Sequence, residues 1–153
     1  MAALALAVAA TAAVAAVRLS AVRTNNWSVN SPAAVFVPLT GAGATAVGFA
    51  LPAAGRKVLT YSAECAVNAP AGNNTAWLDI DIIVNGVVVP PTVGTGDAFC
   101  DANGTAGFDG WARNSITVVI TGLAGANTVR VVARGNGGAT GLWLGQSALV
   151  VHD

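Results

Sequence analysis

Apolar and polar residues alternate with a period of two along much of this chain, and this pattern constrains the fold most strongly. Between residues 57 and 67 one set of alternate side chains is apolar throughout: Leu59, Tyr61, Ala63, Cys65 and Val67. The intervening side chains include Thr60, Ser62 and Glu64. Because successive side chains of a strand point to opposite faces, the segment is predicted to be a strand with one buried side.

A second alternating segment, 77–84, is followed by a turn signal. Its inward positions are Leu78, Ile80, Ile82 and Val84, which leaves Asp79 and Asp81 together on the opposite face. Asn85-Gly86 is a strong signal for a two-residue hairpin turn. The partner strand is predicted over 87–89 and should end at Pro90-Pro91, since proline cannot donate to a ladder.

The rest of the chain after Arg23 has the same organisation. Further strands are predicted at 35–39, 47–51, 115–121, 128–133 and 147–152, with linkers rich in Gly and Asn at 41–43, 69–74, 94–110 and 135–141. About eight short strands with such linkers are typical of an all-β sandwich or jelly roll. We therefore predict one domain over residues 23–153, a two-sheet antiparallel sandwich of jelly-roll type.

An Ala-rich apolar segment, residues 1–22, precedes this domain. Arg18 is the first ionisable side chain. One interpretation is a signal peptide cleaved after the small residues Ala13-Val14-Ala15, and another is a retained segment buried during assembly. A membrane anchor is the third, but the run is shorter than about 20 residues and mostly alanine, so no stable membrane span is expected.

Charge is scarce, which bears on the partners of the protein. Only 9% of the 153 residues are charged, and seven Lys plus Arg balance seven Asp plus Glu. Without a basic cluster, nucleic-acid binding is not expected. Because soluble domains usually carry charge on about a quarter of their residues, part of the surface is predicted to be buried against other copies of the chain.

Two segments carry a resemblance to a known family. A strand that ends in Asn85-Gly86 and continues into a valine strand (77–89) resembles the central part of C1q/TNF-like jelly rolls, and so does the final hydrophobic strand within 144–151. The resemblance covers about residues 33–153. It implies a homotrimer that binds other proteins or forms a structural cap, with convergence on a jelly roll as the alternative.

Cys65 and Cys100 are the only cysteines. In an exported or virion protein they are expected to form a disulfide, whereas in a reducing cytosol they would remain two separate buried thiols. A zinc site is not expected, since the chain has one histidine.

The paired carboxylates Asp79 and Asp81 have two interpretations. Their spacing is similar to that of glycosidase carboxylates, but those flank a substrate from different elements. Because Arg130 and Arg134 share one face of a later strand, structural ion pairs are the favoured interpretation. With His152 as the only histidine and no nucleophile elbow, no catalytic residue is predicted and the chain is not expected to be an enzyme.

The loop around the second cysteine contains oxygen ligands that suit calcium: Asp97, Asp101, Asn103 and Asp109. Calcium needs six or more oxygens, and the alternative is a set of Asx turns. No other cofactor is predicted.

Four tryptophans lie next to loops, at positions 27, 77, 111 and 143. Exposed indoles stack on sugar rings, so Trp77, Trp111 and Trp143 are candidate glycan-binding residues. They can equally cover the ends of the sandwich or pack in a subunit interface.

These features together predict a non-enzymatic structural or interaction protein that assembles with copies of itself, as a trimer or a larger array. The expected location is extracellular, at a cell surface or at a virion surface. The alternative is a secreted carbohydrate-binding module that uses the loop tryptophans.

Overall fold

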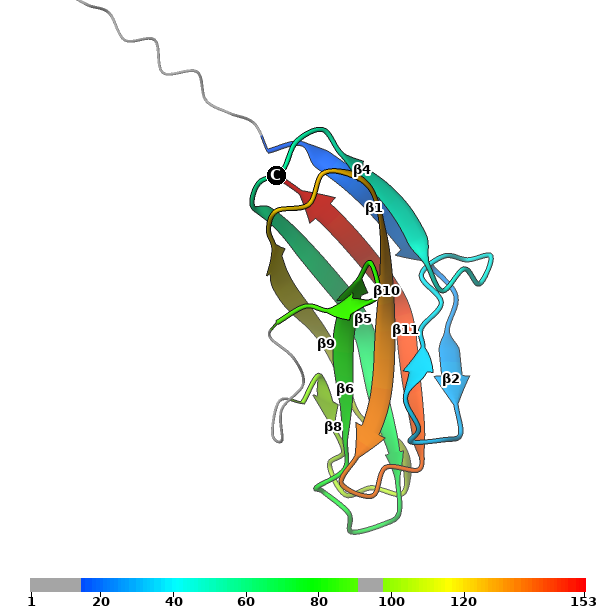
Figure 1. Ribbon diagram of the computed structural model, residues 1–153. Coiled ribbons are helices and arrows are strands. Elements are labelled where there is room, and N and C mark those ends of the chain that lie inside the picture. The colour runs from blue at the N-terminus through cyan, green and yellow to red at the C-terminus, as the bar shows by residue number, and fades with distance from the viewer. Residues whose placement is uncertain (1–14, 91–97) are drawn as a thin grey trace, which may run out of the picture.

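The protein is an all-β sandwich of two antiparallel sheets, as the sequence predicts (Figure 1). Its structure is a computed structural model that describes residues 15–90 and 98–153. The described residues form eleven strands. The predicted fold class, an all-β sandwich of two antiparallel sheets, is therefore confirmed.

Sheet A contains five strands, four of them in the order β1-β11-β5-β9, while β2 pairs with β11. Their bounds are β1 Val17–Arg23, β2 Trp27–Val29, β5 Lys57–Ala69, β9 Gly107–Ile120 and β11 Gly141–His152. All pairings in this sheet are antiparallel.

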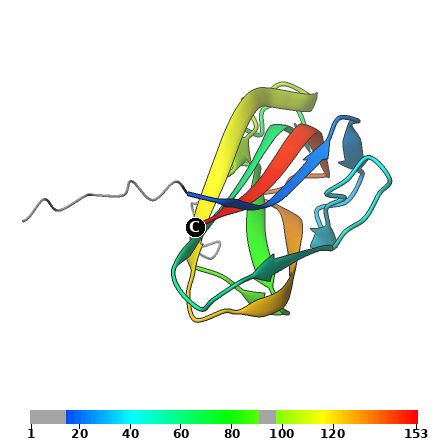
Figure 2. The same cartoon turned by 90° about the horizontal axis from the view of Figure 1, so that it is seen from above.

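Sheet B contains six strands, four of them in the order β3-β10-β6-β7, while β4 pairs with β10 and β8 with β6. Their bounds are β3 Val35–Phe36, β4 Val47–Leu51, β6 Trp77–Val84, β7 Val87–Val88, β8 Cys100–Asp101 and β10 Gly125–Asn136. Seen from above, the two sheets form separate layers (Figure 2).

The chain crosses repeatedly between the layers. It runs from β4 in sheet B to β5 in sheet A, then to β6 in sheet B, and later from β8 to β9, β10 and β11 in alternate sheets. The first strand, β1, lies beside the last, β11. This interleaving of the two halves of the chain is the arrangement of a jelly roll.

The core lies between the sheets and contains the predicted apolar faces of β5 and β6. Leu59, Tyr61, Leu78 and Ile82 are fully buried there. Burial of a large apolar side chain contributes about 1.5–3 kcal/mol, so these alternating positions account for much of the stability.

The hairpin predicted at Asn85-Gly86 is confirmed. Both residues have positive φ, 51° and 83°, as a type I′ turn requires, and Val84 pairs with Val87 across it. The Asn85 side chain also accepts a hydrogen bond from the backbone nitrogen of Thr128 at 2.9 Å, which ties the turn to β10.

The N-terminal boundary differs from the predicted one. β1 begins at Val17 and pairs with β11, so the sandwich includes residues 17–22, which the sequence analysis assigned to the apolar segment. The inward side chains of this strand include Ala21 and also Arg23, which breaks the apolar alternation. Residues 1–14 lie outside the described part of the chain, so the interpretation of that segment remains a prediction.

Other strand bounds also differ. β2 and β8 are too short to show a period, and β8 lies within the predicted linker 94–110. β9, β10 and β11 extend beyond the predicted segments because Gly and Asn are accommodated within them. β3 ends at Phe36.

Arg23 is buried, with 1% of its surface exposed. Its guanidinium donates to the carbonyl oxygens of Pro38 at 3.0 Å, Leu144 at 3.2 Å and Gly145 at 2.7 Å, and also to that of Asn25. Burial lowers the pKa of Arg23 below its usual value. The side chain therefore joins the end of β1, the loop before β4 and the irregular part of β11.

Within residues 15–90 and 98–153, no helix is long and apolar enough to cross a membrane.

Candidate functional site

The outward side of sheet A is almost free of charge over most of its width. Two rows of paired residues cross β1, β11, β5 and β9, and a third row contains His152 of β11, Val58 and Val119. We call ten of these side chains the neutral face, which His152 borders: Ser20, Val22, Val58, Thr60, Ser62, Ser115, Thr117, Val119, Ala148 and Val150. Val22 and Val119 are 56% and 46% exposed, so the apolar part of this face is open to contact.

Beside the neutral face, two tryptophans meet across β5. Trp111 of β9 and Trp143 of β11 pack edge to face, with ring centroids 4.5 Å apart and ring planes at 70°. Trp111 is 61% exposed. Ala66 of β5 pairs with Trp143 and is fully buried. A small side chain thus lies where two large ones meet.

Gly145 makes room for this arrangement. A Cβ at this position would lie 2.5 Å from Cη2 of Trp143 and 2.6 Å from Oε2 of Glu64. The pairing of β11 with β5 is irregular between Leu144 and Ser147, so the backbone departs here from regular strand geometry. Glycine therefore allows the indole and the carboxylate to approach the strand.

An ion pair adjoins the indoles. Arg113 Nη2 lies 2.7 Å from Glu64 Oε1, with the two side chains 62% and 42% exposed. A pair this exposed contributes little to stability. The ion pair nevertheless places guanidinium donors and carboxylate acceptors beside the two indole rings. We call Glu64, Trp111, Arg113, Trp143 and Gly145 the tryptophan site.

Trp77 lies apart from this site, on β6 of sheet B. A Cβ on Gly137 would be 2.7 Å from its Cζ3, so its ring packs against the loop that follows β10. Of the three tryptophans predicted to bind a ligand, the structure brings together Trp111 and Trp143. Trp27, on β2, packs against the core.

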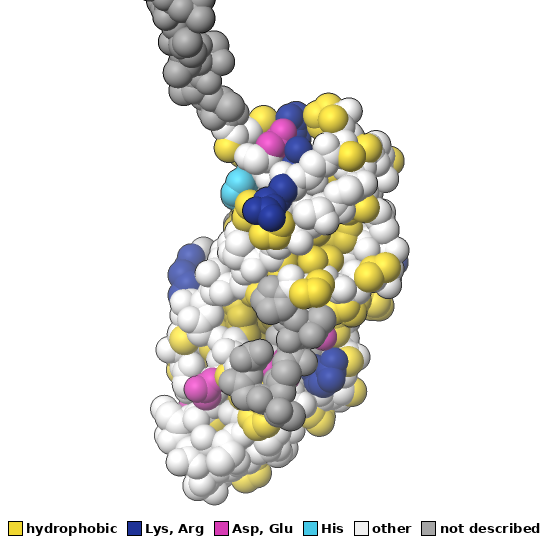
Figure 3. Space-filling view, turned by 60° about the vertical axis from the view of Figure 1, so that its left-hand side comes forward, with side chains coloured by type: hydrophobic (Ala, Val, Ile, Leu, Met, Phe, Trp, Pro, Cys, Tyr) yellow, Lys and Arg dark blue, Asp and Glu magenta, His cyan; other side chains and the backbone are white. Residues whose placement is uncertain are grey.

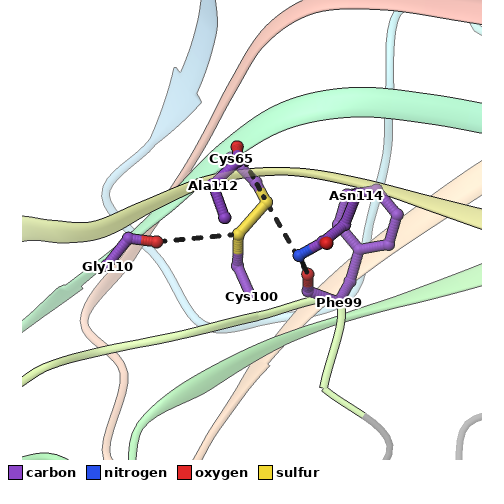
Figure 4. Close-up of a disulfide and its surroundings, with 6 residues drawn as sticks. All are labelled: Cys65, Phe99, Cys100, Gly110, Ala112 and Asn114. Atoms are coloured by element: carbon purple, nitrogen blue, oxygen red, sulfur yellow. Dashed lines mark hydrogen bonds between the residues drawn. A yellow bond between two sulfur atoms is a disulfide. The ribbon is translucent and has the colours of Figure 1, made fainter.

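The disulfide predicted between Cys65 and Cys100 is confirmed (Figure 4). It joins β5 of sheet A to β8 of sheet B, with 6.1 Å between the Cα atoms, and both residues are buried. Beside it, the Asn114 side chain donates a hydrogen bond to the carbonyl oxygen of Phe99. The disulfide therefore fixes the loop that contains Phe99 to the core.

Asp79 and Asp81 point to the outward side of sheet B but are 3% and 9% exposed. Arg134 Nη2 lies 3.4 Å from Asp81 Oδ2, which agrees with the predicted ion pairing for these two residues. Asp79 accepts a hydrogen bond from the side chain of Asn136.

Arg130, predicted to pair with the same carboxylates, packs over the ring of Phe36 at 4.7 Å from its centroid. Arg130 and Phe36 line a surface pocket of about 380 Å³. Its other lining residues are Ile83, Asn85, Gly86 and Thr128. A cation over an aromatic ring contributes about 0.5–1 kcal/mol at an exposed site. Arg130 contacts Phe36 and not a carboxylate as predicted, because the residue directly opposite Arg130 on β6 is Ile83.

The candidate calcium loop contains Asx geometry. The backbone nitrogen of Thr105 donates to Asn103 Oδ1 at 3.0 Å and to Asp109 Oδ2 at 2.8 Å. Asp101 is exposed, and Asp97 lies outside the described residues. Among those residues, no group of three or more His, Cys, Asp or Glu side chains is placed to hold a metal ion. Calcium binding stays a prediction.

A cluster of opposite charges lies where β1 begins and β11 ends. Arg18 donates twice to Asp153, each at 2.6 Å, and Lys57 Nζ lies 3.7 Å from the same carboxylate. The hydrogen bond from Arg18 lowers the pKa of Asp153. The neutral face lies between this charged cluster and the tryptophan site.

Comparison with known proteins adds little. No protein-family model and no curated protein matches the chain. Among solved structures, it is similar to dimeric latent PorU from Porphyromonas gingivalis, with a TM-score of 0.39 and 11% identity. The match covers 95% of this chain and 14% of that chain, so this chain spans a small part of its length. Fold and site define the protein as a disulfide-linked β-sandwich with an aromatic surface site.

Glu64, Arg113 and Gly145 are the members of the tryptophan site that the sequence analysis missed. The only available signal was the outward position of Glu64 in the alternating segment 57–67. Its contact with Arg113 depends on the register of β5 against β9.

Proposed function

We propose that the protein is a non-enzymatic structural or interaction protein, a subunit that associates with copies of itself in an extracellular or particle-surface assembly. The neutral face is the observation that carries this proposal. Its ten side chains are Ser, Thr, Val or Ala, and they continue across four strands. Such a surface can be buried against a second copy without the desolvation of charged groups.

The neighbouring tryptophan site supports the same function. Tryptophan and arginine are enriched among the residues that dominate binding energy at protein interfaces. Trp111 and Arg113 are exposed at the border of the neutral face. The surface thus combines an apolar anchor with a polar rim, as interfaces between proteins do.

The disulfide and the family resemblance support the location and the form of the assembly. Disulfides persist in oxidising compartments, which favours an extracellular, cell-surface or virion-surface location. The jelly-roll order of the strands is what the resemblance to the C1q/TNF-like family implies. On that resemblance, the assembly is a trimer or a larger array.

Native mass spectrometry of the full chain at micromolar concentration tests the proposal. We expect a species with the mass of several chains, confirmed by light scattering. A single species with the mass of one chain contradicts self-assembly.

A second candidate function, glycan binding, is favoured by the exposed Trp111 beside Trp143. Indole faces stack on sugar rings, and the adjacent Glu64 and Arg113 offer hydrogen-bonding partners for hydroxyl groups. Calorimetric titration with a panel of polysaccharides tests it.

The matched variants for that titration are Trp111→Ala and Phe36→Ala. Phe36 is an aromatic residue 41% exposed on sheet B, away from the tryptophan site. We expect Trp111→Ala to abolish binding and Phe36→Ala to preserve it. Equal loss in both variants, or no binding by the natural chain, contradicts this function.

A further inference from the structure

β9 is a long strand at the edge of sheet A. Within the described part of the chain it pairs with β5 on one side and with no strand on the other (Figures 1 and 2). An edge strand presents unpaired backbone donors and acceptors, which form a template for another strand. In Figure 3, which brings this side of the molecule forward, most of the described residues in view are uncharged or hydrophobic, with charged side chains at scattered points.

Several other strands at sheet edges contain features that hinder strand addition, and the segment 115–120 of β9 lacks them. β1 carries the charged Arg18 at its start. In sheet B, β3 and β7 are two residues long, and Pro90 follows β7 closely. Short strands, charges and proline are the usual protections of an edge. The segment 115–120 of β9 contains no charge, no proline and no glycine.

We propose that β9 of one copy pairs antiparallel with β9 of a second copy, about a two-fold axis at Thr117, so that sheet A continues from one subunit into the other. This inference rests on the self-assembly proposed above and adds to it a contact at the edge of sheet A, which leaves the neutral face open for burial against a further copy.

The side chains of β9 suit a second copy of the same strand. In this register Thr117 lies opposite Thr117 of the second copy, and Ser115 lies opposite Val119. Pairs of threonines and other β-branched residues stabilise adjacent strands. On the inward side, Ile116 lies opposite Val118 of the second copy. Ile116 is only partly buried in the single chain, although it packs against the core, so a second strand would complete its burial.

Charge is compatible with this register. Arg113 lies four residues from the axis, so the two copies of Arg113 are about 26 Å apart at about 3.3 Å per residue, and like charges do not meet. The edge of sheet B on the same side of the sandwich is β7, whose Val87 and Val88 are 67% and 38% exposed. These valines add apolar area beside the paired strands.

A two-fold contact closes after two copies. A larger array therefore needs a further contact, and the tryptophan site, which stays exposed in the single chain, is available for it.

Thr117→Lys in the full chain tests the proposal, with Thr60→Lys as the matched control. The hydroxyl groups of Thr60 and Thr117 lie 3.0 Å apart, so each variant removes the same contact and adds the same charge to the same face. Only residue 117 lies on the edge strand. We expect native mass spectrometry to show loss of the two-fold edge contact in Thr117→Lys. Thr60→Lys should keep that contact and weaken only association through the neutral face, to which Thr60 belongs.

A mixture of Thr117→Lys and Thr117→Glu chains provides a second readout. Opposite charges then meet at the axis, so association should return in the mixture and be absent from each variant alone.

Three outcomes overturn this inference and leave self-assembly intact. The first is a Thr117→Lys protein that still associates, and the second is a mixture of the Lys and Glu variants that does not associate. The third is equal dissociation of both lysine variants, which indicates that the copies meet through the face of the sheet. A natural chain that is monomeric contradicts the proposed function itself.

Discussion

Trp143 lies across Gly145 so closely that a methyl group there would be 2.5 Å from the indole. We therefore expect Gly145→Ala to displace Trp143 from Trp111 and to lower the free energy of unfolding by about 1–3 kcal/mol, the usual cost of overpacking. The loss of the indole pair is measured by near-ultraviolet circular dichroism and the stability by urea unfolding.

Gly48→Ala is the control for that substitution. A Cβ on Gly48 would lie 3.8 Å from the nearest atom, the carbonyl oxygen of Asn127. Its spectrum should therefore match that of the natural chain. An unchanged spectrum for Gly145→Ala contradicts the tryptophan site as described.

Tyr61 is the only tyrosine, and burial raises its pKa above the usual 10.0, an effect that the neighbouring Ser147 and Arg23 partly offset. Because the folded state retains this proton longer than the unfolded state, the contribution of Tyr61 to stability is complete below pH 10 and is lost as pH rises further. We expect the midpoint of urea unfolding to fall above that pH.

The phenolate absorbance of the folded protein reports this residue alone, so its titration should be displaced to high pH. In Tyr61→Phe the decline of stability above pH 10 should be shallower. A normal titration in the folded protein is incompatible with the buried position of the side chain.

The disulfide between Cys65 and Cys100 spans 35 residues of sequence and joins the two sheets. In the chain-entropy model its loss costs roughly 3–4 kcal/mol. We expect that decrease in guanidinium unfolding of the natural chain after reduction. The double variant Cys65→Ala with Cys100→Ala should be equally destabilised and insensitive to reductant. A small change on reduction indicates that the bond contributes little to the fold.

The parts of the fold that were predictable are those in which one face of a strand is buried along its length. In 57–67 and 77–84 the apolar side chains that face the core recur with a period of two, which is visible in the sequence. β1 was missed because its last inward residue is the charged Arg23, whose environment consists of carbonyl groups from distant segments. Asp79 and Asp81 face outward as predicted, but their burial depends on tertiary contacts that periodicity does not report.

The candidate site was only partly predictable, since its geometry depends on register. Trp111 and Trp143 are on strands that both neighbour β5, and each pairing contains an irregularity, between Cys65 and Val67 on one side and between Leu144 and Ser147 on the other. A shift of one residue would turn either indole to the opposite face. The disulfide was easier to predict from the sequence, because two cysteines allow only one pairing.

Arg23 provides a final test of how the sandwich is held together at the end of β1. Replacement by methionine retains a long apolar side chain but leaves the carbonyl groups of Pro38, Leu144 and Gly145 without their donor. Each buried acceptor left unsatisfied costs about 1–3 kcal/mol, so Arg23→Met should lower the free energy of unfolding by at least about 3 kcal/mol.

Arg23→Lys should retain part of the stability that Arg23→Met loses, since one ammonium cannot reproduce the planar set of guanidinium donors. Arg18→Met on the same strand removes only an exposed ion pair with Asp153 and should change stability little. Urea unfolding of the three variants decides the matter: similar stability for Arg23→Met and Arg18→Met means that the buried guanidinium does not support the fold.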